Sequence, residues 1–433
     1  MDQMAAQTST SHTPSKDSPT QDAHKDDGRN DEVISYEMSV YQAGLHSAKP
    51  PFTFQPSFWE PLAKDVLSAN AWGYLHGNAG AGTSYQNNPS AFKHFSMMPR
   101  RTCQSLLNPR GQETLPDVSV TVFGEKLPFP VAMAPIGVQK IFDLEGESGA
   151  ARGGASVGIP YILSTASSAS IEEVSSAMDE VSPTARRWYQ LYWPSRQHDD
   201  ITISLLGRAK RAGYTVLFVT LDTYMLGWRP SDMDNGYNPF LHPDRIGVEI
   251  GLTDPAFRAH FKNEHGYGIE ETNQQHHHHH TGTSSDKNKG GLGPAAREWA
   301  KIIFPGHPHT WDDIKFLKQH WDGPIVLKGI QDVEDAGKAK ECGVQGIVFS
   351  NHGGRQMDGG LSSLATLPGI VRAVGDEMEI FFDSGIRCGA DIIKALALGA
   401  KCVLVGRPYA YGLALGGGTV SRTFCGPCAE TCS

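Results

Sequence analysis

The sequence predicts an α/β fold: a closed (β/α)₈ TIM barrel with an N-terminal helical extension and a long loop after the fourth strand. From residue 131 onwards, short apolar runs alternate with helical stretches, which is typical of parallel strands buried on both faces. There are eight such runs, the number that closes a barrel, although an open doubly wound sheet shares this alternation. The predicted strands are Val131–Ala134, Tyr161–Ser164, Trp188–Tyr192, Thr215–Asp222, Pro324–Gly329, Gly346–Asn351, Glu379–Ser384 and Lys401–Gly406.

Two segments precede the barrel. Residues 1–32 are rich in Ser, Thr, Gln, Asp and Lys and almost free of aliphatic side chains, so we expect a disordered tail. Residues 33–130 mix helical patterns with proline-rich turns such as "KPPFTFQPSFWEPLAK". We expect this second segment to form an extension that caps the barrel.

The barrel is expected over residues 131–416, with helical stretches such as "WDDIKFLKQHW" and "GADIIKALALGA" between its strands. The longest connection, residues 223–323, follows the fourth strand on the side where barrels carry their active sites, a position that suits a lid. It contains the low-complexity segment 272–291. We interpret the His276–His280 run in it as part of a solvated loop and predict no metal site.

Residues 417–433 form an atypical cysteine-containing tail. They show no apolar pattern with a 3.6-residue period, so we predict that the eighth helix is truncated. The run Cys425-Gly-Pro-Cys428 resembles a thioredoxin-type redox motif. Such a motif must follow a strand and open a helix, which this tail does not offer, so we expect no redox role.

Composition excludes several kinds of partner. The chain has 38 Lys and Arg against 47 Asp and Glu, a formal net charge of −9, which argues against nucleic-acid binding. No apolar run reaches the roughly 18 residues of a membrane span, so no membrane partner is expected. The seven cysteines are odd in number and no secretory signal is recognisable, which favours a reducing, cytoplasmic location.

Polar residues follow the last two predicted strands, where barrels commonly bind phosphate through backbone N–H groups and cations. The run Asp383-Ser384-Gly385-Ile386-Arg387 follows the seventh strand, and Gly406-Arg407 follows the eighth. The glycines permit close approach and the arginines supply charge. We therefore predict a site for a phosphorylated cofactor or substrate, the alternative being that both arginines form surface ion pairs.

A second cluster has the residue types of an acid–base site. His352 and Arg355 flank two glycines after the sixth strand, so both side chains can face one pocket. Histidine is the usual base near neutral pH, and arginine binds carboxylates bidentately. Asp222 can raise the basicity of His352, and Lys328 places a cation where negative charge develops. These residues suit proton abstraction from a substrate that carries a carboxylate.

The motifs around these residues resemble the FMN-dependent α-hydroxy acid oxidases and dehydrogenases. The resemblance rests on "SNHGGRQMDGG", "DSGIRCGADIIKALALGA" and "VLVGRPYAYGLALGG" and spans roughly residues 74–416. Within the family, "MAPIGVQK", "NPFL" and the long fourth-strand loop look most like lactate 2-monooxygenase. Ser384 stands where a glycine is common, and Ala166 stands where some members carry a large aromatic residue.

The resemblance implies a role for each matching residue. His352 corresponds to the catalytic base, Asp222 to its electrostatic partner, and Tyr192 to a tyrosine that contacts the reacting substrate. The implied substrate-binding residues are Tyr74, Tyr192, Arg229 and Arg355. The implied FMN-binding residues are Pro135, Ile136, Gly137, Ser164, Gln190, Thr220, Lys328, Ser350, Asp383, Gly385, Arg387, Gly406 and Arg407.

The activity implied is FMN-dependent oxidation of a short, lactate-like L-2-hydroxy acid to the 2-keto acid, with electrons passed to O₂. Gly137 stands where oxidases typically carry alanine, and the space left beside the flavin would favour oxidative decarboxylation of the product. That glycine could instead serve backbone geometry alone. A peroxide-releasing oxidase, or an inactive flavin-binding or misfolded product of truncation, remain alternatives. A homo-oligomer, a tetramer by resemblance, is expected.

Overall fold

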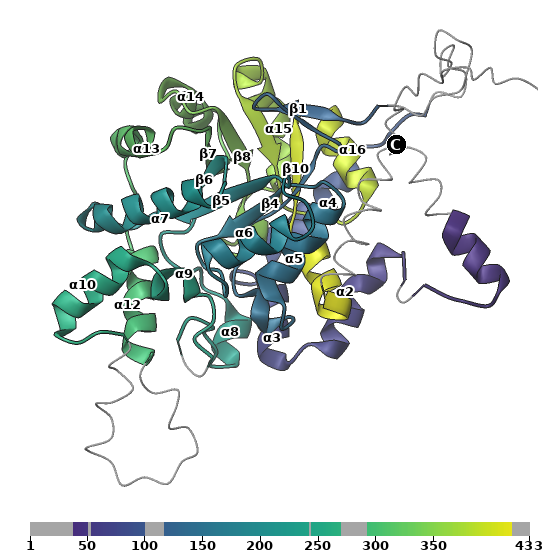
Figure 1. Ribbon diagram of the computed structural model, residues 1–433. Helices are drawn as coiled ribbons and strands as arrows, with labels where there is room; N and C mark the ends of the chain where they lie inside the picture. Colours follow the sequence, from purple (N-terminus) through teal and green to yellow (C-terminus); the bar gives the residue numbers. More distant parts are fainter. Residues whose placement is uncertain (1–37, 51–52, 100–116, 242–243, 270–291, 418–433) are drawn as a thin grey trace, which may run out of the picture. The chain divides into compact units, whose positions relative to one another are not determined.

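The protein is described by a computed structural model that covers residues 38–50, 53–99, 117–241, 244–269 and 292–417 (Figure 1). Two compact units, 1–51 and 52–433, divide the chain, and everything below concerns the second. The predicted tail 1–32, the segment 272–291 with His276–His280, and the tail 417–433 apart from its first residue lie outside the described residues. No helix in the described ranges is long and apolar enough to cross a membrane.

Eight parallel strands close into a barrel, which confirms the predicted fold class (Figure 1). Each predicted strand coincides with an observed one, and the last strand pairs with the first, Val403 opposite Val131, to complete the ring. The strands follow the chain around the barrel in the order β3 (Val131–Met133), β4 (Tyr161–Ser164), β5 (Arg187–Tyr192), β6 (Val216–Thr220), β7 (Ile325–Ile330), β8 (Gly346–Phe349), β9 (Glu379–Phe382) and β10 (Cys402–Val405).

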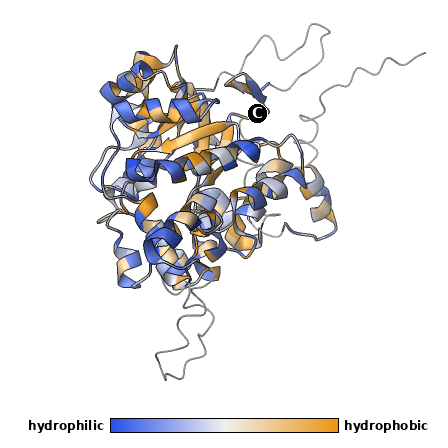
Figure 2. Ribbon diagram, turned by 60° about the vertical axis from the view of Figure 1, so that its left-hand side comes forward, coloured by the Kyte–Doolittle hydropathy of each residue, from blue (hydrophilic) through white to orange (hydrophobic). Residues whose placement is uncertain are grey.

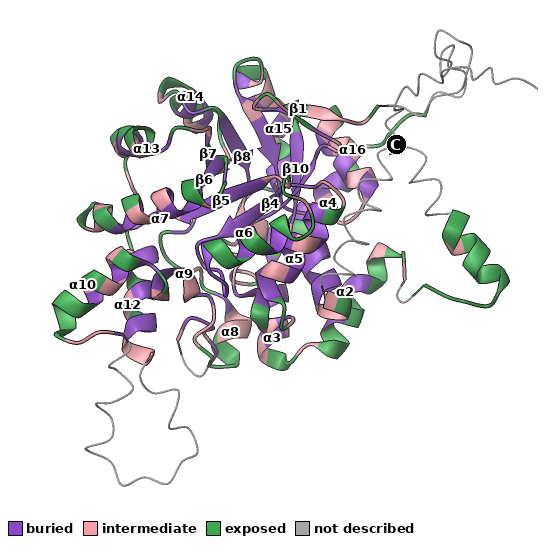
Figure 3. Cartoon of the chain, viewed as in Figure 1, coloured by how far each residue is buried: buried purple, intermediate pink, exposed green. Residues whose placement is uncertain are grey.

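Amphipathic helices cover the outside of the barrel. Their outward faces are exposed and polar, whereas the strands are buried and apolar (Figures 2 and 3). Helix α6 begins with a capping box between Ser170 and Glu173, which satisfies N–H groups that the first turn leaves unpaired. The surrounding helices are α5 (Gly146–Ser156), α6 (Ile171–Asp179), α7 (Asp199–Arg211), α13 (Ile314–His320), α14 (Val333–Glu341), α15 (Ser363–Val374) and α16 (Gly389–Ala397).

The inside of the barrel is a packed core rather than a channel. The Trp188 ring stacks on Phe218 at 5.5 Å between centroids and meets Phe381 edge-on at 5.9 Å. An antiparallel pair, β1 (Val120–Val122) and β2 (Glu125–Leu127), buries Val122 and Leu127 in the same cluster. This pair fills the amino end of the barrel, so the carboxyl ends of the strands are left for ligands.

The part of the extension after residue 52 contains helices α2 (Pro56–Val66), α3 (Ala69–His76) and α4 (Thr83–Ala91). The Asp358 carboxylate, in the loop after β8, accepts hydrogen bonds from the N–H groups of Ala81 and Ser84, each at 2.8 Å. Because Asp358 follows the carboxyl end of a barrel strand, these bonds fix α3 and α4 at the rim that carries the candidate site.

The connection between β6 and β7 is largely helical in its described residues. It contains α8 (Pro230–Asp234), α9 (Glu249–Leu252), α10 (Pro255–His265) and α12 (Gly293–Ile303). Trp299 of α12 is fully buried, and its ring lies so close to Gly251 that a Cβ there would come within 2.2 Å of it. The long loop predicted from the sequence is therefore a packed subdomain on either side of residues 270–291.

Residues 407–417 form a helix directly after β10. Tyr409, Tyr411 and Leu413 are buried, and the Tyr409 hydroxyl donates to the carbonyl of Ala134 at 2.9 Å. The predicted truncation of the eighth helix concerns 417–433, of which only Gly417 is described, so it stays a prediction.

Candidate active site

A cavity opens at the carboxyl ends of the strands. Its apolar wall includes Phe142, Leu226, Phe240 and Phe304. Most of the residues selected from the sequence line it together, although they come from the ends of seven strands, or the loops after them, and from the extension. They are Tyr74, Pro135, Ile136, Gly137, Tyr192, Arg229, Lys328, His352, Arg355, Asp383, Gly385, Arg387, Gly406 and Arg407.

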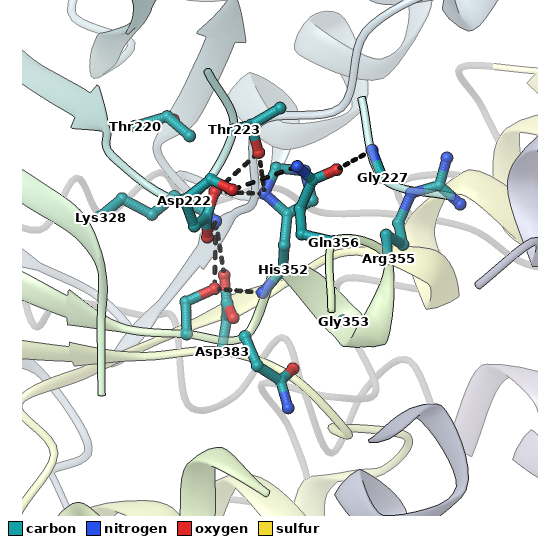
Figure 4. A network of polar contacts seen from close by, with 12 residues as sticks. Thr220, Asp222, Thr223, Gly227, Lys328, His352, Gly353, Arg355, Gln356 and Asp383 are labelled. Atoms are coloured by element: carbon teal, nitrogen blue, oxygen red, sulfur yellow. Dashed lines mark hydrogen bonds and ion pairs between the residues drawn. The ribbon is translucent and has the colours of Figure 1, made fainter. Parts of the chain in front are cut away.

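His352 lies in a tight turn, η6 (His352–Gly354), directly after β8 (Figure 4). Its Nδ1 is 2.8 Å from Oδ1 of Asp222 and 3.1 Å from Oγ1 of Thr223. The carboxylate fixes the proton on Nδ1. Among the described residues nothing hydrogen-bonds to Nε2, so this unprotonated nitrogen is free to accept a proton from a ligand.

Burial, the Asp222 carboxylate and the Lys328 ammonium group set the charge states around His352. Burial lowers the pKa of the imidazole, and the attraction of Asp222 only partly offsets this, so the ring is neutral at pH 7. Burial would raise the pKa of the Asp222 carboxyl, but Lys328 and His352 hold it well below its usual range. The site therefore presents a neutral base backed by an ionised acid.

Lys328 is buried at the end of β7, and its ammonium group is surrounded by acceptors. Its Nζ is 3.1 Å from Oγ of Ser350, 3.6 Å from Oδ2 of Asp222 and 3.7 Å from Oδ2 of Asp383. Burial opposes the charge, yet the two carboxylates keep the pKa of Lys328 above its ordinary value. Figure 4 shows Lys328, Asp222 and Asp383 gathered on one side of His352, with Arg355 on the other.

Arg229 and Arg355 both lie near the ring of Tyr74, with Cζ atoms 5.8 and 4.9 Å from its centre. In the described part of the chain neither guanidinium forms an ion pair with a carboxylate. Arg355 donates instead to the carbonyls of Tyr74 and Gly77, both at 2.7 Å. Burial and the charge of Arg229 lower the pKa of Arg355 to about 9. Two largely shielded cations that form no ion pair with a described carboxylate make a site for an anion such as a substrate carboxylate.

Arg387 and Arg407 form a second cationic cluster further along the pocket. Both guanidiniums lie over the ring of Tyr85, at 5.8 and 4.8 Å from its centre. Arg407 donates to carbonyls of Leu75 and Gly77 at 3.1 and 3.0 Å, and no ion pair with a carboxylate is found for either arginine among the described residues. Arg407 also opens the helix 407–417, whose N-terminus favours anions. The cluster matches the predicted phosphate site.

The remaining selected residues lie behind the cavity wall. Ser164, Gln190 and Thr220 form a row across three adjacent strands, in which the Ser164 hydroxyl donates to Oε1 of Gln190 at 2.8 Å and Nε2 of Gln190 donates to Thr220 Oγ1 at 2.9 Å. Ser350 accepts from Lys328 and from the His352 N–H. These side chains are therefore hydrogen-bonded to one another or to neighbouring residues of the site.

Gly137 packs against the loop after β4. A Cβ at this position would lie 2.5 Å from the carbonyl oxygen and 2.8 Å from the Cβ of Ala166. The contact accounts for the glycine without reference to a ligand, which favours the backbone explanation left open by the sequence.

Gln356 has a structural role that the sequence analysis did not assign, although it lies inside a quoted motif. Its Oε1 accepts from the Gly227 N–H at 3.2 Å and from Nη2 of Arg229 at 3.0 Å. Its Nε2 donates to the carbonyls of Asp222 and Met225. Gln356 thus joins the loops that carry the arginine, the aspartate and the histidine. Its position one residue after Arg355 was the available signal.

No cluster of His, Cys, Asp and Glu suited to a metal occurs among the residues that could be searched. At the rim of the closed barrel lie a His–Asp pair and two cationic clusters that form no ion pairs with the described carboxylates, an arrangement typical of TIM-barrel enzymes that bind anionic ligands. A model of the FMN-dependent dehydrogenases matches residues 63–424. The chain belongs to this family, the FMN-dependent α-hydroxy acid oxidases and dehydrogenases, and FMN is its cofactor.

Relatives and solved structures agree with this assignment. The chain is 54% identical over 374 residues to an FMN-dependent alpha-hydroxy acid dehydrogenase of Schizosaccharomyces pombe, covering 86% of this chain and 84% of the relative. It is 36% identical to an L-lactate oxidase of Lysinibacillus sphaericus, over 86% and 85% of the two chains. A crystal structure of mandelate oxidase with 3,3-difluoro-2-hydroxy-3-phenylpropionic acid matches with a TM-score of 0.68 and 31% identity, over 87% and 92%.

The residues present fit an FMN molecule. The phosphate would lie between Arg387 and Arg407, whose charges have no carboxylate partner among the described residues, beside the backbone of Gly385 and Gly406. Gly385 has a φ of +96°, and a Cβ there would lie 2.7 Å from the backbone of Asn88, so only glycine leaves this wall undisturbed. Lys328 would supply a positive charge at the other end of the cofactor.

Proposed function

We propose that this enzyme oxidises a short, lactate-like L-2-hydroxy acid to the 2-keto acid and passes the electrons through FMN to O₂. The proposal is supported mainly by one arrangement: the free Nε2 of His352 and the unpaired guanidiniums of Arg229 and Arg355 line the same cavity. A 2-hydroxy acid carries a carboxylate, which the arginines can bind, next to the carbon and hydroxyl group that lose their protons when the acid is oxidised. FMN, when bound, accepts the two electrons released.

In this proposal Arg229 and Arg355 bind the substrate carboxylate, and Tyr74 and Tyr192 contact the carboxylate and the hydroxyl group. Nε2 of His352 removes a proton, and Asp222, 2.8 Å from Nδ1, stabilises the imidazolium that results. Burial keeps the pKa of Tyr192 above its ordinary value, so its hydroxyl stays protonated and able to donate. The roles of Tyr192 and Asp222 are those of positioning and charge stabilisation.

The cofactor residues are proposed in two groups. Lys328 faces the electron-accepting ring, with Pro135, Ile136 and Gly137 against it and Ser164, Gln190, Thr220 and Ser350 supporting it from behind. Asp383, Gly385, Arg387, Gly406 and Arg407 hold the ribityl phosphate. The division into two groups is supported by the charges that line the cavity, Lys328 for the ring and the pair Arg387 and Arg407 for the phosphate.

For the oxygen reaction we propose release of peroxide, so that the acid and O₂ give the 2-keto acid and H₂O₂. The argument for internal decarboxylation rested on space beside Gly137, and the contact of that glycine with Ala166 gives it another cause. The L-lactate oxidases among the relatives support the oxidase outcome by their names.

The test is to mix the FMN-loaded protein with L-lactate without oxygen and to measure the loss of oxidised-flavin absorbance. We expect reduction by L-lactate and not by D-lactate, and H₂O₂ in stoichiometric amount when air is admitted. If neither isomer of lactate nor any other short L-2-hydroxy acid reduces the FMN, the proposed activity is excluded. With catalase present, pyruvate as product supports the oxidase, and acetate that persists supports decarboxylation.

His352→Gln is the matched control. It should bind FMN normally, because His352 contacts neither arginine of the phosphate cluster, and should not be reduced by the acid. Normal reduction of this variant would exclude His352 as the base.

A further inference from the structure

Ser384 has a backbone conformation that serine seldom adopts. It follows β9 with a φ of +81°, and Gly385 after it has a φ of +96°. In this left-handed region a glycine is unstrained, whereas a residue with a Cβ is disfavoured. Ser384 is also buried, so its side chain is held among fixed neighbours.

The hydroxyl of Ser384 makes two hydrogen bonds to the catalytic rim. It donates to Oδ1 of Asp383 at 2.7 Å and accepts from the N–H of Gly353 at 3.0 Å. Gly353 is the residue after His352, and the other carboxylate oxygen of Asp383 faces Lys328 at 3.7 Å. The serine therefore lies between the turn that carries the imidazole and the ion pair that carries the ammonium group.

Among the described residues, this link is the one bond donated by an N–H group of the histidine turn to a residue outside the loop after β8. The N–H of His352 is bonded to Oγ of Ser350, and that of Gly354 to Oδ1 of Asn351, both within the loop after β8 itself. The N–H of Gly353, in contrast, donates to Ser384 in the loop after β9. Its carbonyl is held separately by Arg407 at 3.1 Å, so the turn keeps a second anchor if the serine bond is lost.

With these bonds the polar contacts close into a ring. It runs from Lys328 through Asp383 and Ser384 to the His352 turn, and back through the imidazole and Asp222 to Lys328, by contacts of 3.7, 2.7, 3.0, 2.8 and 3.6 Å.

We propose that Ser384 is a positioning residue that couples the His352 turn to the Lys328–Asp383 pair. Its bond to Gly353 fixes the position of the His352 base relative to the Lys328 cation, which would lie at the electron-accepting end of FMN. Its bond to Asp383 weakens the attraction between that carboxylate and Lys328. Without the hydroxyl, Asp383 would offset more of the Lys328 charge, and the reduced, anionic cofactor would lose stabilisation. The inference rests on the family's use of FMN and not on which acid is the substrate.

The experiment compares Ser384→Ala with Ser384→Gly in the FMN-loaded protein. Both lose the hydroxyl, but alanine keeps the unfavourable φ and glycine relieves it. We expect both variants to show a more negative FMN reduction potential and a roughly five- to tenfold slower reduction by substrate, the effect of one lost hydrogen bond. Thermal unfolding without FMN should separate them, with the glycine variant the more stable.

Ser175→Ala is the control, because Ser175 is a buried hydroxyl on α6 that donates to the Ala212 carbonyl at 2.7 Å, remote from the cavity. It should lower the unfolding midpoint and leave the potential unchanged. If both Ser384 variants keep the wild-type potential and rate within twofold, the coupling does not exist. If only the alanine variant is impaired, backbone conformation and not the hydroxyl is responsible, which also overturns the proposal. The potential is measured without substrate, so it stays informative if L-lactate is not oxidised.

Discussion

Replacing Asp222 by asparagine should isolate the charge that supports the catalytic histidine. Asparagine has nearly the shape of aspartate, and its Oδ1 can still accept the Nδ1–H of His352, so the imidazole orientation is kept. The negative charge is lost. Lys328 retains Asp383 as a partner, so this ammonium is not left without a counter-ion.

The magnitude follows from the geometry. The imidazole and the carboxylate are 2.8 Å apart and largely shielded from solvent, with 17% and 14% of their side chains exposed. Losing a buried charged partner of this kind costs about 2–5 kcal/mol, so reduction of FMN by substrate should slow by roughly 30- to 5,000-fold. A deuterium label at C2 of the acid should show whether the slowed step is the bond cleavage itself.

The pH dependence gives a second, independent signature. Burial already lowers the pKa of His352, so the wild-type rate should hold constant down past the ordinary histidine pKa and fall only in more acidic solution. Asp222 raises that pKa, and removing its charge lowers it further. The variant should therefore be slower at all pH values, with its acid limb moved to lower pH.

Thr223→Val is the matched control, since it removes the hydroxyl 3.1 Å from Nδ1 but leaves the carboxylate in place. The rate of FMN reduction by substrate should fall by no more than about tenfold in this variant, which is the effect of one lost neutral hydrogen bond. The reasoning is refuted if Asp222→Asn reduces FMN at the wild-type rate, or if its acid limb moves to higher pH.

Three further outcomes are expected. Arg355→Met should weaken binding of the carboxylate substrate by about 2–5 kcal/mol with little change in FMN affinity, and an unchanged KM would contradict its role. Lys328→Met leaves two buried carboxylates uncompensated and should lower the free energy of unfolding by about 3–5 kcal/mol in urea titrations. Gly137→Ala should destabilise by about 1–3 kcal/mol through its clash with Ala166. Gly337→Ala is its control, because Gly337 lies in helix α14 and an added Cβ would have nothing within 4 Å. It should raise the free energy of unfolding by about 0.5–1 kcal/mol in the same assay. Equal unfolding midpoints for the two glycine variants would refute the packing argument.

Much of the barrel could be predicted because its signal is local. Each strand is a short apolar run, and the residue that ends it is also the residue that lines the rim, so strand ends predict the site directly. His352, Lys328 and Arg407 were found in this way and all line the cavity. The closure of the barrel followed from counting the runs.

The contacts between loops could not be predicted, since they depend on distances between segments far apart in the chain. Gln356 bonds to Gly227 and Arg229 across more than a hundred residues, and no pattern in the sequence indicates that pairing. The same holds for Asn88 and Asn351, whose amides exchange hydrogen bonds at 2.8 Å. Gly137 was open to two explanations until Ala166 was located beside it.

The extension and the barrel depend on each other through charge. Arg355 and Arg407 are partly buried cations that follow β8 and β10, and both donate to carbonyls at the C-terminal end of α3, including that of Gly77. A helix C-terminus stabilises positive charge, and its last carbonyls have no partners within the helix. The guanidinium groups therefore have hydrogen-bond acceptors, and the last carbonyls of α3 have hydrogen-bond donors. Since α3 also places the Tyr74 ring beside Arg229 and Arg355, the anion site is complete only with α3 in place, and α3 and the barrel belong to the same compact unit.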